Sequence, residues 1–416
     1  MANNNQHTKP NVPPLRFPGF SVEWERVKVS DLLDFFSTNS LSWDMLNYEN
    51  GKILNLHYGL IHKDLPTIVN MKDANLPFIN NDKIPKNYTI CENGDVAFAD
   101  ASEDTNDVGK AIEFINIDRD IVCGLHTIHG RDKTDITVDG FKGYLFSSKA
   151  YHNQIRRIAQ GTKIYSISSK NMDEIYLGIP SKREQEKIFA LLYAIDRRIA
   201  TQNKIIEKLQ SLIKGLIQKL TKEGISNSSW HKVILSNILI ERCEQNKESY
   251  PVHSVSVTAG VINQVEYLGR SFAANDTSRY HVVRYGDIIY TKSPTGNQPY
   301  GIVKQSHCQE PVAVSPLYGV YKPLSFEIGN YLHYYFLNPL NTNNYLSPLI
   351  QKGAKNTINI SNQRFLGNKI PIPVDIKEIR TISNTLSAIN QKIQTEKSIH
   401  TSLVMQKKFL LQKLFI

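Results

Sequence analysis

The sequence predicts an α+β protein in which two lobes are each followed by a long helix, and in which the two helices pair as a coiled coil. Three observations lead to this prediction. An apolar heptad pattern runs from residue 179 to residue 220, a second copy of it fills the C-terminal stretch, and short phrases recur in both lobes. A single long helix with one apolar stripe is stable in water only when a partner covers the stripe, and this chain supplies the partner itself.

The first long helix is expected to begin after Pro180, with Ser181 and Glu184 forming a capping box. Gly224 is expected to end the helix. Its apolar residues recur at alternating spacings of four and three, which is typical of the a and d positions of a coiled coil. About forty residues at roughly 1.5 Å each give a rod about 60 Å long. The predicted apolar seam of this helix consists of Ile188, Leu192, Ile195, Ile199, Leu209 and Leu216.

The second long helix matches the first at an offset of 194 residues and repeats the capping pair at Asp375 and Glu378. Gln202 and Glu396 occupy equivalent positions and predict a polar layer that sets the register. Two ordinary core helices of one large domain are the alternative, but the uninterrupted length and the matched helix starts favour the coiled coil. The predicted seam of this helix consists of Ile382, Leu386, Ile389, Ile393, Leu403 and Leu410.

The lobes also repeat, because the phrase that begins at Trp24 returns at Trp230, and because Gly94-Asp95 returns as Gly286-Asp287. Each Gly-Asp pair precedes β-branched and aromatic residues, which predicts a turn into a buried strand. The order of lobe, helix, lobe and helix indicates a tandem duplication of about 200 residues. Further strands are expected at 112–117, 255–257 and 282–285, and a helical segment at 331–337. The predicted parts are a disordered lead-in (1–23), a first lobe (24–178), a first helix (179–224), a second lobe (225–372) and a second helix (373–416).

The net charge of +10 is unevenly distributed. Residues 24–176 hold 17 Lys and Arg against 22 Asp and Glu, a net of −5, whereas residues 225–371 hold 13 against 8, a net of +5. A basic chain permits nucleic-acid binding, but the acidic first lobe would need local basic loops to hold phosphates. The polar N-terminus lacks the apolar core of a signal peptide, which predicts a cytoplasmic protein. Four scattered cysteines without a CxxC motif predict reduced thiols, with neither a disulfide framework nor a zinc site.

The sequence offers no catalytic centre and no metal site. No two glycines are separated by a single residue, which excludes the GxG turn of dinucleotide sites. Asp375 and Lys377 have the Asp-x-Lys spacing of nuclease centres, but the capping role already explains Asp375. His126 and His129 are three residues apart in a Gly-flanked run without a third ligand nearby in sequence, so a satisfied loop pair is favoured over a metal site.

Because the sequence offers no catalytic centre, a binding function is favoured. Several loops combine basic, amide and aromatic residues. Arg and Lys can contact guanine or phosphate, Asn and Gln can read adenine, and Thr can contact a methyl group. An ordinary solvated loop is the alternative for each candidate. The candidate nucleic-acid contacts are Arg131, Lys133, Asn153, Arg156, Arg157, Lys163, Lys292, Thr295, Asn297, Gln298, Lys352 and Lys355.

The chain resembles the specificity subunit of type I restriction–modification systems. The likeness lies in the two differing lobes, in the Pro-x(3-4)-Glu start of each long helix, and in the opening phrase from Leu15 to Glu25. The resemblance implies that each lobe is a target recognition domain, reading half of a split site on double-stranded DNA. It also implies an antiparallel coiled coil that docks two methyltransferase subunits, with restriction subunits completing the enzyme. No catalytic residue and no cofactor belongs to this chain on that basis, since S-adenosylmethionine, ATP and Mg²⁺ belong to the partner subunits.

Two other classes of protein compete with this interpretation. A coiled-coil scaffold that joins two protein-binding lobes would need no nucleic acid. A stand-alone nuclease–methylase fused to recognition lobes would need the glycine and catalytic motifs that the sequence lacks.

Overall fold

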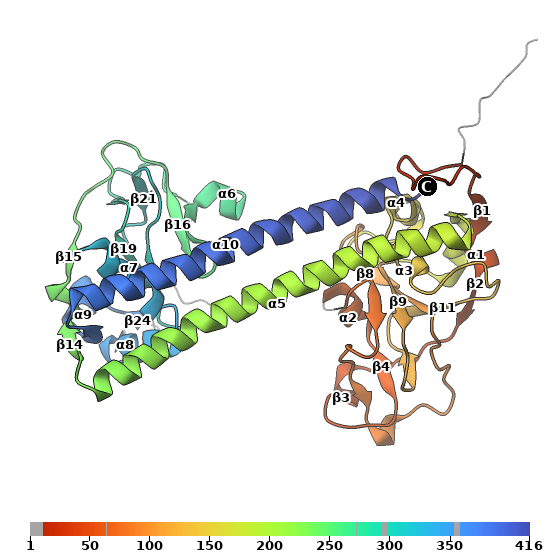
Figure 1. The fold of residues 1–416 in the computed structure, drawn as a ribbon, viewed down its shortest axis with the longest axis horizontal. Helices are drawn as coiled ribbons and strands as arrows, with labels where there is room; N and C mark the ends of the chain where they lie inside the picture. Colours follow the sequence, from red (N-terminus) through yellow and green to blue (C-terminus); the bar gives the residue numbers. More distant parts are fainter. Residues whose placement is uncertain (1–10, 64, 272, 293–295, 297, 353–357) are drawn as a thin grey trace, which may run out of the picture. The chain divides into compact units, whose positions relative to one another are not determined.

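The computed structural model describes residues 11–63, 65–271, 273–292, 296, 298–352 and 358–416 (Figure 1). The chain divides into two compact units, one formed by Met1–Gln202 with Ile399–Ile416 and the other by Asn203–Ser398. The two long helices, α5 (Lys182–Ser226) and α10 (Ile376–Lys413), each contribute one part to each unit. Sheets and helices mix within both units, which confirms the predicted α+β class.

The first unit contains a five-stranded sheet of order β2-β11-β7-β9-β5 and a four-stranded sheet of order β10-β4-β6-β3. The pairs β5–β9 and β10–β4 are parallel, and the other pairs in these sheets are antiparallel. Two further pairs, β1–β13 and β8–β12, are antiparallel. The strands are β1 (Glu25–Lys28), β2 (Leu33–Phe36), β3 (Leu46–Asn47), β4 (Leu54–Leu56), β5 (Ile68–Asn70), β6 (Phe78–Ile79), β7 (Val96–Ala99), β8 (Ala101–Ser102), β9 (Ala111–Ile115), β10 (Ile121–Cys123), β11 (Thr127–Asp132), β12 (Tyr165–Ser166) and β13 (Tyr176–Ile179).

Helices cover this sheet system and close its core. Phe98 of β7, Phe146 and Tyr151 form an aromatic cluster with ring centroids 4.8 to 6.3 Å apart. This cluster shares one core with Leu192 of α5 and with Leu414, which directly follows α10. The short helices are α1 (Val29–Leu32), α2 (Tyr58–Lys63), α3 (Phe141–Leu145), α4 (Lys149–Ile158) and the 3-10 turns η1 (Trp43–Met45), η2 (Asn81–Lys83) and η3 (Ser169–Glu174).

The second unit is built on a four-stranded sheet of order β15-β22-β19-β20, together with the pairs β14–β25, β16–β17, β18–β21 and β23–β24. Its core includes the stacked rings of Tyr290, Tyr321 and Phe365, with centroids 4.7 and 5.0 Å from the Phe365 ring. The strands are β14 (Trp230–Ile234), β15 (Leu239–Glu241), β16 (His253–Ser256), β17 (Gly260–Asn263), β18 (His281–Val283), β19 (Ile288–Thr291), β20 (Ile302–Gln305), β21 (Val312–Val314), β22 (Gly319–Pro323), β23 (Gln351–Lys352), β24 (Ile358–Asn359) and β25 (Lys369–Pro373). The helices are α6 (Gln264–Leu268), α7 (Phe326–Tyr335), α8 (Pro339–Leu346), α9 (Asn362–Gly367) and the 3-10 turns η4 (Leu235–Asn237) and η5 (Ser347–Leu349).

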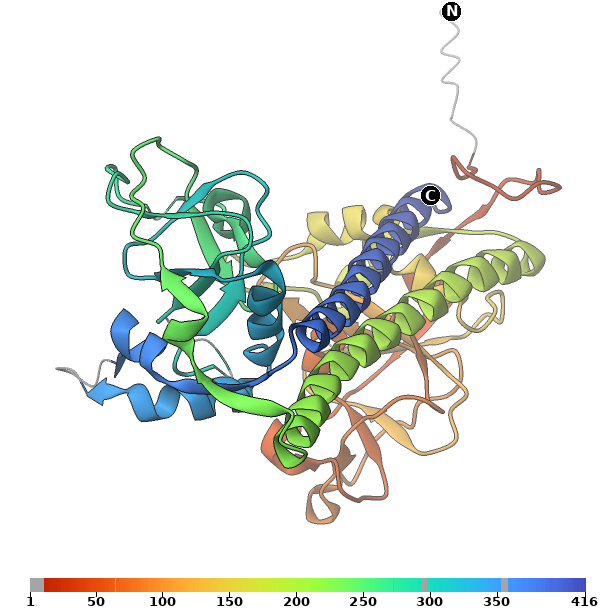
Figure 2. The same cartoon turned by 60° about the vertical axis from the view of Figure 1, so that its left-hand side comes forward.

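Within each unit the two long helices lie side by side and run in opposite directions (Figures 1 and 2). In the first unit, Leu192 near the start of α5 shares a core with Leu410 near the end of α10. In the second unit, Ile213 late in α5 shares a core with Ile382 early in α10. The antiparallel coiled coil that the resemblance implied is therefore confirmed.

Several local predictions are also confirmed. Gly94 and Gly286 have φ values of 81° and 87°, and each turn leads into a strand whose residues are all buried, β7 and β19. Strands β9, β16 and β18 overlap the three other strands expected from the sequence, and α7 overlaps the expected helical segment. The boundaries differ by a few residues, since Tyr285, expected at the end of a strand, lies beyond β18.

The starts of the long helices correct the prediction of two capping boxes. Both oxygens of the Glu184 carboxylate accept from Arg16, at 2.7 and 2.8 Å, instead of closing a capping box at the helix start. Asp375 does cap α10, because its Oδ1 accepts from the N–H of Lys377 at 2.8 Å. Glu378, however, accepts from the indole N–H of Trp230. Both glutamates therefore tie the helix start to a distant segment of the chain.

Two further expectations are wrong. The segment from residue 11 to residue 23 is not a disordered lead-in, because Leu15 donates its N–H to the carbonyl of Lys413 and Arg16 pairs with Glu184. Helix α5 does not end at Gly224, since it continues to Ser226. A Cβ at Gly224 would lie 2.3 Å from the Trp230 ring, so this glycine is required for the close approach of the indole and not for a helix end.

The two lobes share a strand register. The orders β2-β11-β7-β9 and β15-β22-β19-β20 correspond, with β7 and β19 offset by 192 residues. Ala97 of β7 pairs with His129 of β11, and Ile289 of β19 pairs with Val320 of β22. The duplication therefore extends from the anchor phrases to the pairing of individual strands.

Candidate nucleic-acid interface

Helix α4 presents three of the predicted contacts on its exposed face. Ser148 caps the helix by accepting from the N–H of Tyr151 at 3.2 Å. Tyr151 and Ile155 are buried in the core of the first unit, which turns the intervening positions outward. The exposed polar residues of this helix include Asn153, Arg156 and Arg157. Arg156 donates to Asn153 and, at 3.2 Å, to Asn106, so part of this surface is already ordered.

The other candidate DNA contacts of the first lobe differ in how much of each side chain is already bound by other residues of the lobe. The guanidinium of Arg131 binds both carboxylate oxygens of Asp95 and the carbonyl of Ile90, and it pairs with Glu92. These contacts give the Arg131 guanidinium a structural role within the lobe, instead of leaving it exposed for a DNA contact. Lys133 pairs with Asp34 across 3.3 Å at the surface, and Lys163 lies exposed in the turn after α4.

The candidates of the second lobe are only partly described. Lys292 is half-buried. Gln298 is 4% exposed, and its buried side-chain oxygen has no hydrogen-bond partner among the described residues. Lys352 belongs to β23, and its backbone alone is described. The remaining candidates, Thr295, Asn297 and Lys355, lie outside the described residues.

A cleft of about 620 Å³ in the second unit was not anticipated from the sequence. Its cationic lining comes from Lys214 of α5, Lys304 of β20 and Lys397 of α10, and the imidazoles of His307 and His333 also line it. None of the lining residues in the described part of the chain is acidic. Burial lowers the pKa of Lys304 to about 8, and burial next to Lys304 holds the pKa of His333 well below its usual value. Such a lining is chemically suited to an anionic group such as a phosphate.

Each lobe also holds a buried aspartate that binds an arginine through both carboxylate oxygens. Asp95 accepts from Arg131 at 2.8 and 2.9 Å, and Asp287 accepts from Arg242 at 2.7 and 3.0 Å. Both aspartates are 1% exposed. Burial opposes ionisation of Asp95, but hydrogen bonds from His129 and Arg131 lower the pKa of its carboxyl. The repeated Gly-Asp phrase was the sequence signal for these aspartates, and nothing in the sequence pointed to their arginine partners.

The seam residues lie where the two long helices meet the cores of the units. Buried members include Ile188 and Leu192 in the first unit and Ile382 and Leu386 in the second. Among the rest, Ile195, Ile393, Leu403 and Leu410 are also buried, and Ile199, Leu209, Leu216 and Ile389 are partly buried. Gln202 and Glu396, proposed as a polar layer, are buried at 8% and 5% exposure. Ile217, which is fully buried, was missed because it lies one position beyond the seam.

One group of side chains in the described residues could hold a metal ion, formed by Cys91, Cys123 and His129. The sequence predicted no metal site and placed His126 and His129 together in a loop. The structure corrects the second point, because His129 is a buried residue of β11, whereas His126 is exposed beside Asp100. No helix in the described part of the chain has the length and apolar character needed to cross a membrane.

Comparisons with known proteins bear on the family and the fold. Residues 21–211 match the family model described as type I restriction modification DNA specificity domain. No curated protein matches the chain. The crystal structure of the type I restriction–modification S subunit from M. genitalium is 15% identical, with a TM-score of 0.58, over 97% of this chain and 99% of that one.

Two other solved structures are similar over most of their length. The HsdS subunit from Thermoanaerobacter tengcongensis is 16% identical, with a TM-score of 0.42, over 94% of this chain and 96% of that chain. A structure described as the basis of complex assembly and conformational transition of the type I R-M system is 14% identical, with a TM-score of 0.48. It covers 93% of this chain and 96% of its own. The resemblance to type I restriction–modification specificity subunits is therefore confirmed: residues 21–211 match the DNA specificity domain of that family, and the chain has the fold of the S subunit from M. genitalium.

Proposed function

We propose that this chain is the non-catalytic subunit that reads a bipartite DNA target, with one half-site assigned to each lobe. One observation carries the proposal. The family match covers the first lobe and part of α5, and the second lobe repeats the strand register of the first around its own buried Asp–Arg pair. Because a DNA specificity domain lies in the first lobe, a second lobe of the same construction supports a second reading surface.

In this proposal the exposed basic residues of α4 contact the phosphate backbone. Arg157 and Lys163 are exposed, and they supply positive charge to a lobe whose net charge is negative. In the second lobe, Gln298 lines the cationic cleft, and the half-buried Lys292 is the other described candidate whose side chain could contact DNA. Phosphate contacts of this kind position the protein on DNA, whereas base-edge contacts supply the sequence preference.

We also propose that the two long helices dock two methyltransferase subunits and that restriction subunits complete the complex. Helix α10 carries Met405 and Phe409, which are 66% and 53% exposed and lie four residues apart on one face. Exposed apolar pairs of this kind on a helix are typical of protein–protein contacts. S-adenosylmethionine, ATP and Mg²⁺ are assigned to those partners, and the complex to the cytoplasm.

The experiment exchanges one lobe at a time and maps methylation in cells that also carry the partner subunits. Replacing residues 24–176 with the first lobe of another family member should change one half-site and leave the other unchanged. Replacing residues 230–371 should do the converse. A complex that assembles and methylates but whose target ignores both exchanges would instead fit protein-binding lobes. A contiguous target would contradict the bipartite proposal.

The spacer between the half-sites can be tested separately. Inserting one heptad after Asn203 and a matching heptad after Lys397 adds about 10 Å to each helix. This is close to the rise of three base pairs, at about 3.4 Å each. We expect a longer spacer with both half-sites retained. An unchanged spacer would show that the helices do not set the separation.

A further inference from the structure

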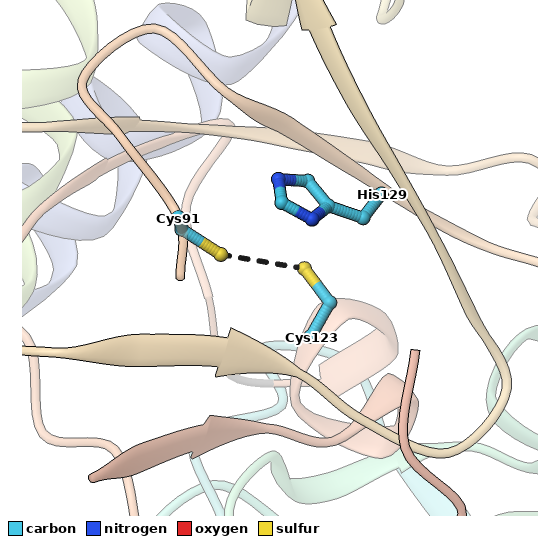
Figure 3. Close-up of side chains that lie close together, drawn as sticks. All are labelled: Cys91, Cys123 and His129. Carbon is cyan, nitrogen blue, oxygen red and sulfur yellow. Dashed lines mark hydrogen bonds between the residues drawn. The ribbon is translucent and has the colours of Figure 1, made fainter. Parts of the chain in front are cut away.

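Three metal-ligating side chains meet in the interior of the first unit (Figure 3). Cys91 precedes the Gly94 turn, Cys123 ends β10, and His129 lies within β11, so the three come from separate segments. The sulfur atoms of Cys91 and Cys123 are 3.6 Å apart, and the three ligand atoms all lie within 4.8 Å of one another. All three residues are buried, with exposed fractions of 2%, 3% and 0%.

The ring of His129 is held in the orientation that a metal ligand needs. Its Nε2 is 2.7 Å from Oδ2 of Asp95. Asp95 is fixed in turn by Arg131 and by the N–H of Glu92 at 2.8 Å. With Nε2–H donated to the carboxylate, Nδ1 is the ring nitrogen left to bind a metal ion, which would displace any proton that it carries. A carboxylate that orients a histidine in this way is a common partner of protein-bound metal ions.

The other ring nitrogen is unsatisfied. Nδ1 of His129 is buried, and no hydrogen-bond partner for it lies among the residues that the structure describes. Figure 3 shows a ring nitrogen of His129 turned toward the two sulfur atoms. Buried polar groups are nearly always paired, so a buried ring nitrogen that faces two thiols without a hydrogen bond needs an explanation.

The second lobe provides an internal control for this cluster. Ile90 pairs with Val122 in the first lobe, and Val282 pairs with Ala313 in the second, so Cys91 and Cys123 correspond to Val283 and Val314. His129 corresponds to Val320 through the register of β11 and β22. These three valines are buried in one apolar cluster. The fold therefore does not require polar residues here, and the first lobe has placed metal-ligating residues at all three positions.

The distances favour a metal over the two simpler explanations. For zinc–sulfur bonds of about 2.3 Å, the sulfurs of a tetrahedral site are about 3.8 Å apart, close to the 3.6 Å found here. A disulfide would require about 2.05 Å. Free cysteines can also fill a core as small apolar residues, but that role does not account for His129.

We propose that Cys91, Cys123 and His129 bind a zinc ion through their two sulfur atoms and Nδ1, with Asp95 orienting the histidine. Two thiolates balance the charge of Zn²⁺, and Arg131 balances Asp95, so the buried site is neutral. Three protein ligands leave the fourth position of a tetrahedral ion for water. The ion would join β10 of one sheet to β11 of the other and stabilise the first lobe.

The first test measures metal content of the full-length protein, purified under reducing conditions, supplied with zinc and desalted. Elemental mass spectrometry should find about one zinc ion per chain. Cys91→Val and Cys123→Val, which introduce the residue of the second lobe, should lose it. Cys308→Val is the matched control and should retain it. Wild-type protein without bound zinc, or equal retention in all variants, would overturn the proposal.

The second test uses the triple variant Cys91→Val/Cys123→Val/His129→Val, which reproduces the apolar cluster of the second lobe and so guards against simple misfolding. A strong chelator should lower the Tm of the wild type and leave that of the triple variant unchanged. Cobalt should give a thiolate charge-transfer band in the wild type only. A loss of two hydrogens in the intact mass of protein purified without reductant, together with no cobalt band after reduction, would assign a redox pair and overturn the zinc site.

Discussion

The first and second lobes have the same strand register but differ in the residues that fill it. At three equivalent buried positions the first lobe has Cys91, Cys123 and His129, and the second has valines. The elements that persist in both are the glycine turn and the buried aspartate bound by an arginine. The glycine turn and the charged pair therefore persist at positions around which other buried side chains have changed. Side chains packed behind them are then free to diverge.

The largest expected loss of stability comes from substitutions in the helix seam, and each substitution should affect a different unit. Leu192→Asp and Leu386→Asp each replace a fully buried leucine and place a charge in a core, costing more than about 5 kcal/mol. Hydrogen exchange should show Leu192→Asp opening the first unit and Leu386→Asp opening the second. Both variants should also lose assembly with the methyltransferase.

A matched control for the seam lies on the same helix. Leu212 of α5 is 51% exposed, so Leu212→Asp should leave hydrogen exchange of both units nearly unchanged. If either seam variant formed the complex with the affinity of the wild type, the pairing of the helices would be contradicted.

The buried aspartates allow a direct comparison of the lobes. Asp287→Ala leaves Arg242 without its bidentate partner and should cost about 3 kcal/mol. Asp95→Ala should cost more, because it removes the partner of both Arg131 and His129. Urea unfolding monitored by hydrogen exchange in each lobe measures the two costs.

Asp34→Ala is the control for this pair of variants, because it breaks only the exposed contact with Lys133. Its cost should stay within about 0.5 kcal/mol. Equal costs for Asp95→Ala and Asp287→Ala would mean that His129 gains nothing from its carboxylate partner.

A smaller difference is expected between the two tryptophans that open the lobes. The indole N–H of Trp230 donates to Glu378 at 2.8 Å, whereas the buried indole N–H of Trp24 has no partner in the part of the chain that the structure describes. Phenylalanine at either position loses similar ring volume, so the hydrogen bond distinguishes them. Trp230→Phe should destabilise by about 1 to 2 kcal/mol more than Trp24→Phe. Repeating Trp230→Phe in a Glu378→Ala background should remove the excess, and an excess that persists would refute the hydrogen bond as its cause.

The smallest expected effect concerns DNA. Arg157→Ala should weaken DNA binding of the assembled complex by up to about 1 kcal/mol for all sequences alike, and reduce the salt dependence by about one phosphate contact. Arg131→Ala should instead lower the stability of the first lobe, since that guanidinium is held by Asp95. Titration of specific and scrambled duplexes at several salt concentrations separates these outcomes. A change of target preference in Arg157→Ala would mean that the residue reads a base.

The structural elements that are set by residues close together in the sequence could be predicted from it. The alternation of three and four along α5 and α10, and the Gly94-Asp95 turn into β7, are local patterns with direct structural consequences. The functions of Glu184 and Glu378 were predicted wrongly, because Arg16 and Trp230 compete for these carboxylates from more than 140 residues away. No local pattern contains those partners.

The same reason explains why the cluster of Cys91, Cys123 and His129 was missed. The ligands are separated by 32 and 6 residues, and they come together only because β10 and β11 belong to different sheets that pack together. Aligning the two lobes at their Gly-Asp turns places Cys91 opposite Val283, but Cys123 and His129 fall opposite Val314 and Val320 only after a shift of one residue, which the strand register supplies. The individual DNA contacts remain predictions, since surface side chains leave no periodic signal in a single sequence.

The division of α10 between the two units has a consequence for the order of folding during synthesis. The second unit is one continuous stretch, Asn203–Ser398, whereas the core of the first unit also requires Leu410, Leu414 and Phe415. On the ribosome, domains usually fold in the order in which they emerge. Here the lobe made first must wait for residues made last, so the second unit can complete its core earlier. A released chain truncated after residue 398 should therefore protect the second unit from protease and leave the first lobe open to cleavage.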